Sequence, residues 1–205
     1  MTRAEFLKMM GAGAAVLALD AVPGASLIQS ANAQTTPLKK NQERLAFGLP
    51  DQEAKVDKPV TAIVIGAGSR GSVYASYSSE YSKALKIVGV ADINSTRRDL
   101  MKNLYGIAPE HCFGDWKEVF NLPKFADAVI IATPDNLHYD PCMVALAAGY
   151  DVLLEKPIAQ TEKECKNILK QAKKYGRIVG VCHVLRYSPY FRALKRVLDE
   201  GRVGD

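Results

Sequence analysis

Residues 60–71 read V-T-A-I-V-I-G-A-G-S-R-G, and this stretch decides the fold. Its apolar start, Ala62 to Ile65, predicts a buried strand of a parallel sheet. The strand leads directly into Gly66-Ala67-Gly68-Ser69-Arg70-Gly71, which matches the pattern G-x-G-x-x-G. In this pattern the first glycine permits a tight turn, the second lets the backbone approach a pyrophosphate, and the third lets helix and strand pack closely. The free N–H groups of the following helix then face the phosphates.

A carboxylate follows the glycine pattern at the spacing expected for a nucleotide site. A second predicted strand ends at Asp92, which stands 21 residues after Gly71. A carboxylate there can accept hydrogen bonds from an adenosine ribose, and its charge favours NAD because it would repel the 2′-phosphate of NADP. Arg97 and Arg98 follow closely and leave NADP as the alternative, unless they lie on a solvated helix face. The glycine pattern lies between a predicted strand and a predicted helix, and Asp92 follows at the expected spacing. Together these features predict a dinucleotide site rather than a glycine-rich turn of another α/β protein.

Strands and helices alternate along the rest of the chain, which predicts an α/β fold with a doubly wound, Rossmann-type parallel sheet of about six strands. The predicted strands are Thr61–Ile65, Lys86–Ala91, His111–Phe113, Ala128–Ala132, Asp151–Leu154 and Arg177–Cys182. The predicted helices lie near residues 69–82, 95–104, 116–120, 138–148, 162–175 and 189–198. The fifth helix is marked best, because Thr161 and Glu164 form a capping box and Gly176 can close it.

Residues 59–187 therefore form a dinucleotide-binding domain, which shorter segments flank. Residues 188–205 contain a further amphipathic helix, which we expect to be the start of a second domain. Residues 34–58 are polar, include Pro37 and Pro50 and show no clear period, so they are interpreted as a linker or arm. The sequence is expected to be the N-terminal portion of a longer enzyme.

The first 33 residues resemble an export signal. Arg3 and Lys8 supply a basic start, Met9 to Leu19 is an apolar stretch too short to span a bilayer, and Ala31-Asn32-Ala33 is an A-x-A cleavage site. The start resembles a twin-arginine signal, except that Ala4 stands where the second arginine belongs. We expect an exported, periplasmic protein with no membrane span after maturation. A cytoplasmic protein with an amphipathic N-terminal helix is the alternative.

Charge and cysteine usage argue against other kinds of site. Residues 161–205 carry 11 Lys/Arg against 5 Asp/Glu, but no aromatic residues interleave with the lysines. Solvated helix faces therefore explain this charge better than a nucleic-acid surface does. The four cysteines form no C-x-x-C pair and have apolar or helical neighbours, so we expect small buried hydrophobes and no metal site. These cysteines are Cys112, Cys142, Cys165 and Cys182.

Polar residues gather after three of the predicted strands. In an open α/β sheet, ligands bind beyond the carboxyl ends of the strands. The segments at these ends are Thr133-Pro134-Asp135-Asn136-Leu137-His138, Glu155-Lys156-Pro157 and His183-Val184-Leu185-Arg186-Tyr187. All three project toward the same edge as the glycine loop, so we expect them to surround the ligand.

Together these segments resemble the Gfo/Idh/MocA family of NAD(P)-dependent sugar and polyol oxidoreductases. The resemblance covers residues 58–205, roughly the first half of such an enzyme, and its most specific part is Glu155-Lys156-Pro157 in register with the T-P-x-x-x-H loop. It implies a C-terminal α+β domain, an open and mostly antiparallel sheet, that is absent here. A histidine and an aspartate of that domain would complete the catalytic group. We expect the full-length enzyme to be a homo-oligomer.

The resemblance also assigns roles to residues of this chain. Lys156 would be catalytic, because its ammonium would polarise the reacting hydroxyl and aid proton transfer, unless it pairs with Glu155. Glu155 would support the site or contact the cofactor, and Pro157 could follow a cis bond. For His138, packing at a helix start is as well supported as contact with a ligand. The residues expected to bind the cofactor are Gly66, Gly68, Ser69, Arg70, Gly71, Asp92, Arg97, Thr133, Pro134, Asn136, His138, Glu155, Lys156, Arg186 and Tyr187.

Three functions remain open at this point. The first is an NAD(P)-dependent oxidoreductase that transfers a hydride between the nicotinamide and a sugar or polyol carbon. Free NAD should be scarce outside the cytoplasm, so an exported enzyme is expected to retain its cofactor. The second is a redox-neutral, NAD-dependent glycosidase, as the family resemblance allows. The third is a catalytically inert nucleotide-binding relative.

Overall fold

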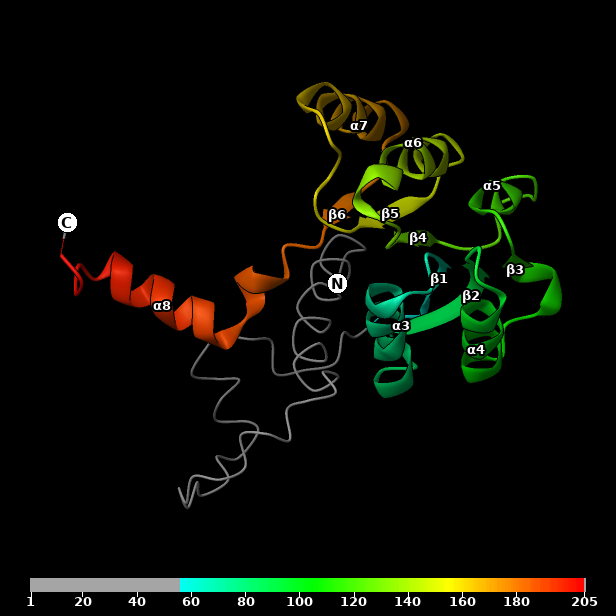
Figure 1. The fold of residues 1–205 in the computed structure, drawn as a ribbon, viewed down its shortest axis with the longest axis horizontal. Coiled ribbons are helices and arrows are strands. Elements are labelled where there is room, and N and C mark those ends of the chain that lie inside the picture. Colours follow the sequence, from blue (N-terminus) through cyan, green and yellow to red (C-terminus); the bar gives the residue numbers. More distant parts are fainter. Residues whose placement is uncertain (1–55, 205) are drawn as a thin grey trace, which may run out of the picture.

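The sheet of the computed structural model has six parallel strands in the order β3-β2-β1-β4-β5-β6 (Figure 1). The structure describes residues 56–204, so the predicted signal and nearly all of the predicted arm lie outside it. The strands are β1 (Val60–Ile65), β2 (Leu85–Ala91), β3 (Cys112–Phe113), β4 (Ala128–Ile131), β5 (Asp151–Leu154) and β6 (Val179–Val181). This order is that of the doubly wound dinucleotide fold, so the predicted fold class is confirmed.

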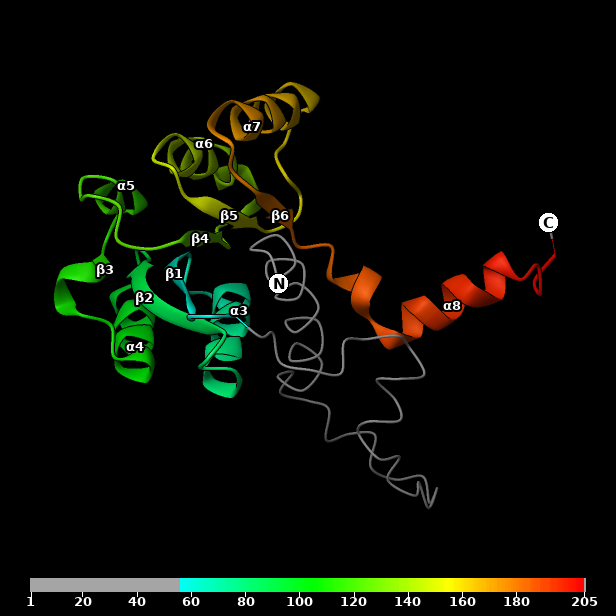
Figure 2. The same cartoon turned by 180° about the vertical axis from the view of Figure 1, so that it is seen from behind.

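Helices cover both faces of the sheet, as Figure 1 shows, with α3 and α4 on one face and α5, α6 and α7 on the other. The sheet helices are α3 (Ser69–Glu80), α4 (Ser95–Tyr105), α5 (Trp116–Val119), α6 (Tyr139–Ala147) and α7 (Glu162–Tyr175). Helix α8 (Pro189–Asp199) projects away from the sheet in both views (Figures 1 and 2) and has no buried residue. No helix of residues 56–204 is both long enough and apolar enough to cross a bilayer.

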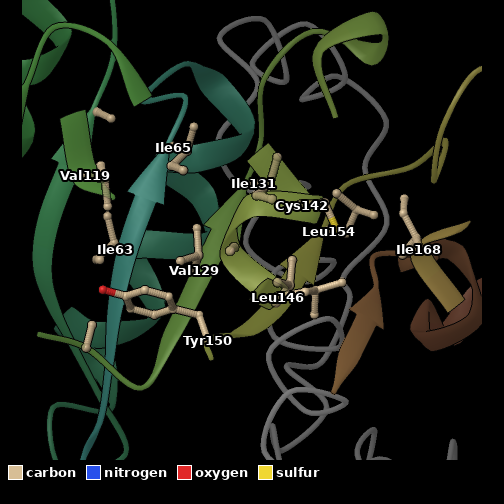
Figure 3. Close-up of a cluster of buried hydrophobic side chains, with 14 of the residues drawn as sticks. Ile63, Ile65, Val119, Val129, Ile131, Cys142, Leu146, Tyr150, Leu154 and Ile168 are labelled. Carbon is tan, nitrogen blue, oxygen red and sulfur yellow. The ribbon is translucent and has the colours of Figure 1, made fainter. Parts of the chain in front are cut away.

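The central strands lie in a hydrophobic core on each face of the sheet. All four residues of β4 are buried, as are all four of β5, which explains why β4 reads as a continuous apolar run. On the face that Figure 3 shows, Ile131 and Leu154 pack with Cys142 and Leu146 of α6 and with Ile168 of α7. Burying each large aliphatic side chain contributes about 1.5–3 kcal/mol, so this core fixes the strand ends that carry the polar loops.

The cysteines differ in part from their prediction. Cys142 and Cys182 are fully buried, as predicted, whereas Cys112 and Cys165 are only partly buried. Cys112 lies in β3 at an edge of the sheet, and Cys165 lies in the first turn of α7, so neither is covered on all sides. All four thiols are free.

His111 has a structural place at the edge of the sheet. Strand β2 gains one residue against β1 between Ala62 and Ile63, which leaves Val88 in a β-bulge. The Nδ1 atom of His111 lies 3.1 Å from the Val88 carbonyl oxygen, and its ring stacks on Phe125 at 4.0 Å between centroids. Strand β3 therefore begins at Cys112, one residue later than predicted, because His111 ends the 3-10 helix η2 (Pro109–His111).

Candidate active site

The turn from β1 to α3 is closely packed at Gly66 and Gly71 and has open space at Gly68. Gly66 has φ +90°, and a Cβ there would lie 2.6 Å from the Ala132 carbonyl oxygen. A Cβ on Gly71 would overlap the Gly66 carbonyl oxygen. Gly68 differs, because the nearest atom to its hypothetical Cβ is Nη1 of Arg97 at 3.7 Å. The chain therefore leaves space over Gly68 for a ligand while it packs closely beneath it.

No side chain caps the amino end of helix α3. Gly68 is its N-cap residue and supplies no capping bond, and its first turn contains no acidic residue. The first intrahelical bond runs from the Ser72 N–H to the Gly68 carbonyl oxygen, 2.9 Å away. The N–H groups of the preceding residues in this turn therefore have no acceptor within the helix. Together with the positive end of the helix dipole, they fit a pyrophosphate.

Asp92 lies against the glycine loop. Its Oδ2 atom accepts a hydrogen bond from the Ala67 N–H at 2.7 Å, and its Oδ1 atom accepts one from the Asn94 N–H at 2.8 Å. Arg98 donates to the Asp92 carbonyl oxygen at 2.7 Å, whereas Arg97 is exposed beside Gly68. This places a ribose acceptor beside the open cradle, so the residues present fit NAD. Of the two arginines that could favour NADP, Arg98 is held by backbone and Arg97 is the one near the loop.

Glu155 is a buried carboxylate, 5% exposed, that follows β5. Its Oε1 atom accepts hydrogen bonds from Arg70 Nε at 2.7 Å and from the Tyr74 hydroxyl at 2.6 Å. Its Oε2 atom accepts one from the backbone N–H of Lys156 at 2.5 Å. Both oxygens are thus bound to the protein, which agrees with the supporting role expected of Glu155, and its contact with the cofactor stays a prediction. A buried charge is stable only when it is paired in this way.

Tyr74 completes this cluster from the second turn of α3. Its hydroxyl accepts a hydrogen bond from Arg70 Nη2 at 2.7 Å, and the Arg70 guanidinium lies 5.0 Å from the centre of the Tyr74 ring. Burial raises the pKa of the Tyr74 phenol, and the neighbouring Cys182 and Glu155 raise it further. Burial also raises the pKa of the Cys182 thiol to about 12. Both groups therefore stay protonated, and the phenol can donate to Glu155.

Lys156 is exposed at the carboxyl edge of the sheet. Within residues 56–204 its ammonium forms no hydrogen bond or ion pair. The alternative in which Lys156 pairs with Glu155 is therefore wrong for this structure, because Glu155 is turned toward Arg70. The Lys156–Pro157 peptide bond is cis, as the sequence suggested. An exposed ammonium with no partner among the described residues is available to a ligand at this edge of the sheet.

His138 does not occupy the place expected of a ligand-binding residue. Its side chain is fully buried at the start of α6. Its Nδ1 atom lies 2.6 Å from the Pro157 carbonyl oxygen, and its Nε2 atom lies 2.9 Å from the Thr133 carbonyl oxygen. Both ring nitrogens face backbone carbonyl oxygens, which agrees with the packing alternative, and contact of His138 with cofactor or substrate stays a prediction. The ring ties the loop after β4 to the loop after β5.

The loop after β4 keeps its other predicted residues accessible. Thr133 follows Ala132, and its hydroxyl donates to the Leu137 carbonyl oxygen at 2.9 Å. Pro134 and Asn136 are exposed, and Asn136 lies in the 3-10 helix η3 (Asp135–Leu137). Because a Cβ on Gly66 would meet the backbone of Ala132 and Thr133, this loop lies directly beside the glycine loop. Its role in cofactor binding stays a prediction.

Arg186 and Tyr187 lie in a different place. They belong to the 3-10 helix η4 (Val184–Tyr187) and line an open groove of about 590 Å³ together with residues of α8. In the described chain, neither side chain forms a hydrogen bond or ion pair with the glycine loop or the Lys156 loop. Their predicted role in ligand binding stays a prediction.

Sequence reasoning missed two residues near the site. Tyr74 stands four residues after Arg70, which places the two side chains on one helix face, and that spacing was the available signal. Ile93 follows Asp92 directly and is 92% exposed, which is unusual for an isoleucine. Nothing local to the sequence indicates that Ile93 stays uncovered, because its exposure depends on the loops around it.

These features define a dinucleotide-binding α/β domain with a free lysine at its ligand edge. A family model described as an oxidoreductase family with an NAD-binding Rossmann fold, Gfo/Idh/MocA, matches residues 60–183. The chain therefore belongs to the Gfo/Idh/MocA oxidoreductase family, and NAD is the cofactor of its fold.

Similar proteins of known sequence include inositol dehydrogenases. Inositol 2-dehydrogenase of Azotobacter vinelandii is 34% identical over 143 residues, which are 69% of this chain and 42% of that protein. The corresponding enzyme of Klebsiella pneumoniae is 32% identical over 142 residues, with the same coverage of both chains. The chain thus spans less than half of the length of the curated relatives it matches.

Solved structures of the family have the same fold. The WlbA dehydrogenase of Chromobacterium violaceum, in complex with NADH and UDP-GlcNAcA, has a TM-score of 0.64 at 21% identity. It aligns with 74% of this chain and 43% of its own. An inositol dehydrogenase homologue of Azotobacter vinelandii, complexed with NADH and myo-inositol, has a TM-score of 0.61 at 24% identity, over 73% of this chain and 41% of its own. At such identities the likeness shows the fold alone.

Proposed function

We propose that the complete protein is an NAD-dependent oxidoreductase that transfers a hydride between the nicotinamide and a hydroxyl-bearing carbon of a polyol or sugar. The observation that carries this proposal is the state of Lys156. Its ammonium is free at the edge of the sheet, and the carboxylate next to it is turned away and bound to Arg70. The inositol dehydrogenases among the relatives support a polyol as the substrate class.

NAD, when bound, supplies the nicotinamide carbon that takes or returns the hydride. The chain's own residues position the cofactor and handle the proton. The N–H groups at the start of α3 bind the pyrophosphate, and Asp92 accepts hydrogen bonds from the ribose. Lys156 holds the substrate hydroxyl through Nζ. As a neutral amine it accepts the hydroxyl proton during oxidation, and as the resulting ammonium it returns that proton during reduction. A positive charge at this place also stabilises negative charge that develops on the substrate oxygen.

The test is substitution of Lys156 in protein expressed from its complete reading frame. Lys156→Ala should lower kcat for polyol oxidation by about 1000-fold while NAD affinity changes less than about twofold, because only proton transfer is lost. Lys156→Arg keeps the charge but cannot give up its proton, so it should remain nearly as slow. Lys163→Ala, an exposed lysine of α7, is the matched control and should be fully active. Unchanged turnover of Lys156→Ala would exclude this function.

The predicted export signal favours a second candidate, a glycosidase that retains NAD and uses it without net oxidation. Ala31-Asn32-Ala33 is the observation behind it, because a periplasmic enzyme would find little free NAD. Exported protein should then carry NAD(H) through purification, seen by absorbance, and should release sugar from a glycoside without accumulating NADH. Net NADH formation from a free polyol supports the dehydrogenase instead. Recovery of the protein with its first 33 residues in the cytoplasmic fraction would remove the reason for this candidate.

A further inference from the structure

Glu155 and Lys156 are adjacent residues of opposite charge that the structure keeps apart. The Glu155 side chain is 6% exposed and points to α3, whereas Lys156 is exposed at the edge of the sheet. If the Glu155 carboxylate lost Arg70 and turned outward, the ammonium of the next residue in the chain would be a cation available to it. What holds Glu155 inward therefore also decides whether the amine of Lys156 is free.

Two side chains of α3 hold Glu155, and they act on the same oxygen. Arg70 Nε and the Tyr74 hydroxyl both donate to Oε1, at 2.7 and 2.6 Å. Arg70 also donates to the Tyr74 hydroxyl at 2.7 Å, so the three side chains form a closed triangle. The carboxylate cannot rotate outward without breaking both of these bonds and its bond from the Lys156 N–H. Charge-assisted hydrogen bonds of this kind are among the stronger ones in proteins.

The triangle of Arg70, Tyr74 and Glu155 also lies next to the proposed pyrophosphate site. Arg70 is the second residue of α3, in the turn whose free N–H groups face the pyrophosphate site. Its side chain is 32% exposed, and Nη1 is not used in the triangle. A ligand that orders the start of α3 therefore also orders the group that holds Glu155.

We propose that Arg70 and Tyr74 are positioning residues that hold Glu155 away from Lys156 and so keep the Lys156 amine free for substrate. The expected effect on turnover rests on the proposed function of Lys156, whereas the expected effect on the pairing of Glu155 with Lys156 does not. Without Arg70, Glu155 loses its partner of opposite charge and turns to the Lys156 ammonium. The paired ammonium then reacts less readily and approaches a substrate hydroxyl less readily.

The first test needs neither cofactor nor turnover. Cofactor-free protein is treated with an N-hydroxysuccinimide ester at pH 8, and acylation of Lys156 is followed over time by peptide mass spectrometry. Arg70→Gln should slow acylation about tenfold, since pairing with a carboxylate stabilises the charged amine. Tyr74→Phe removes one hydroxyl and should slow it about twofold. Acylation of Lys163 in the same sample is the internal control and should not change.

Two further variants separate positioning from a general loss of structure. Arg70→Lys keeps a cation opposite Glu155 and should acylate within about twofold of the native protein. The double variant Arg70→Gln/Glu155→Gln has no carboxylate left to capture Lys156, so its acylation rate should return to the native value. A purely structural role for Arg70 predicts no such recovery. If Arg70→Gln does not fold, Tyr74→Phe with and without Glu155→Gln provides the same comparison.

The second test measures the catalytic consequence in protein expressed from its complete reading frame. Tyr74→Phe should lower kcat about tenfold and leave the affinity for NAD unchanged, because small displacements of a catalytic group reduce turnover more than binding. An acylation rate that is unchanged in both Arg70→Gln and Tyr74→Phe overturns the inference. So does failure of the double variant to recover. If acylation behaves as expected but Lys156→Ala retains full turnover, the inference stands and the proposed function fails.

Discussion

The amino ends of α3 and α7 are built in opposite ways. At α7, Thr161 Oγ1 accepts a hydrogen bond from the Glu164 N–H, and Glu164 Oε2 accepts one from the Thr161 N–H, which completes a capping box. Glu162 and Glu164 also place negative charge in the first turn. At α3, the N-cap is Gly68, no side chain caps the helix, and the first turn has no acid.

This difference indicates that the amino end of α7 stabilises the fold, whereas the amino end of α3 is left free to bind a ligand. The α7 end caps one of its own N–H groups with a side chain and has two acidic residues in its first turn, so it disfavours an anion. The α3 end has neither feature and lies beside Asp92 and the open space over Gly68. Stability that a cap would give α3 is thus absent from the isolated domain, and we expect a bound pyrophosphate to supply it. Changing each end in turn tests this contrast.

The largest effect is expected where the α3 end packs against its own loop. Gly71→Ala places a Cβ against the Gly66 carbonyl oxygen, and because that atom is backbone the turn itself must move. We expect a loss of about 3 kcal/mol or more in the free energy of unfolding, measured by urea denaturation. Gly114→Ala is the matched control, since nothing lies within 4 Å of its hypothetical Cβ. Equal stability of the two variants would contradict the close packing described for Gly71.

A capping residue introduced at the amino end of α3 should make this end resemble that of α7 and should weaken NAD binding. Gly68 has φ −72° and ψ −166°, which other residues adopt, and its Cβ has space. Gly68→Asp should stabilise the cofactor-free protein by about 0.5 kcal/mol, because its carboxylate accepts hydrogen bonds from the free N–H groups. The same charge should weaken NAD binding about 100-fold or more by repelling the pyrophosphate.

Gly68→Asn separates the cap from the charge. It should stabilise the cofactor-free protein by a similar amount. It should weaken NAD binding, measured by calorimetry, about tenfold less than Gly68→Asp does, because no charge opposes the phosphates. Equal NAD affinity in Gly68→Asp and the native protein would show that this helix end does not face the pyrophosphate.

The contrast between these two ends could be predicted from sequence because both signals are local. The glycine pattern at residues 66–71 and the pair Thr161 and Glu164 each lie within a few positions of the chain. Backbone conformation follows from such neighbours, so the strands, the capping box and the left-handed Gly176 at the end of α7 were all predictable. The carboxyl-edge loops followed from strand order alone.

The direction in which side chains turn at that edge was not predictable in this way. Glu155 is fixed by Tyr74, which is 81 residues earlier, whereas in the sequence its adjacent cation is Lys156. His138 is fixed by two backbone carbonyls, one of them on the far loop at Pro157. Such contacts depend on how the sheet brings distant segments together, and no periodic pattern encodes them. Reasoning from sequence therefore located the site but left the partners of Glu155 and His138 open.

The smallest effect is expected at the capped amino end of α7, where a substitution should change stability but not NAD affinity. Thr161→Ala removes the hydroxyl that accepts from the Glu164 N–H at 3.2 Å and leaves that donor to water. The loss in the free energy of unfolding should be about 1 kcal/mol, since the site is exposed. NAD affinity should not change, because α7 begins on a loop that contacts no residue of the glycine turn through a hydrogen bond in the described chain. Thr161→Ser keeps the hydroxyl and should keep the stability. A fall in NAD affinity in Thr161→Ala would mean that the two helix ends are coupled, and the separation between structural and ligand-binding ends would no longer hold.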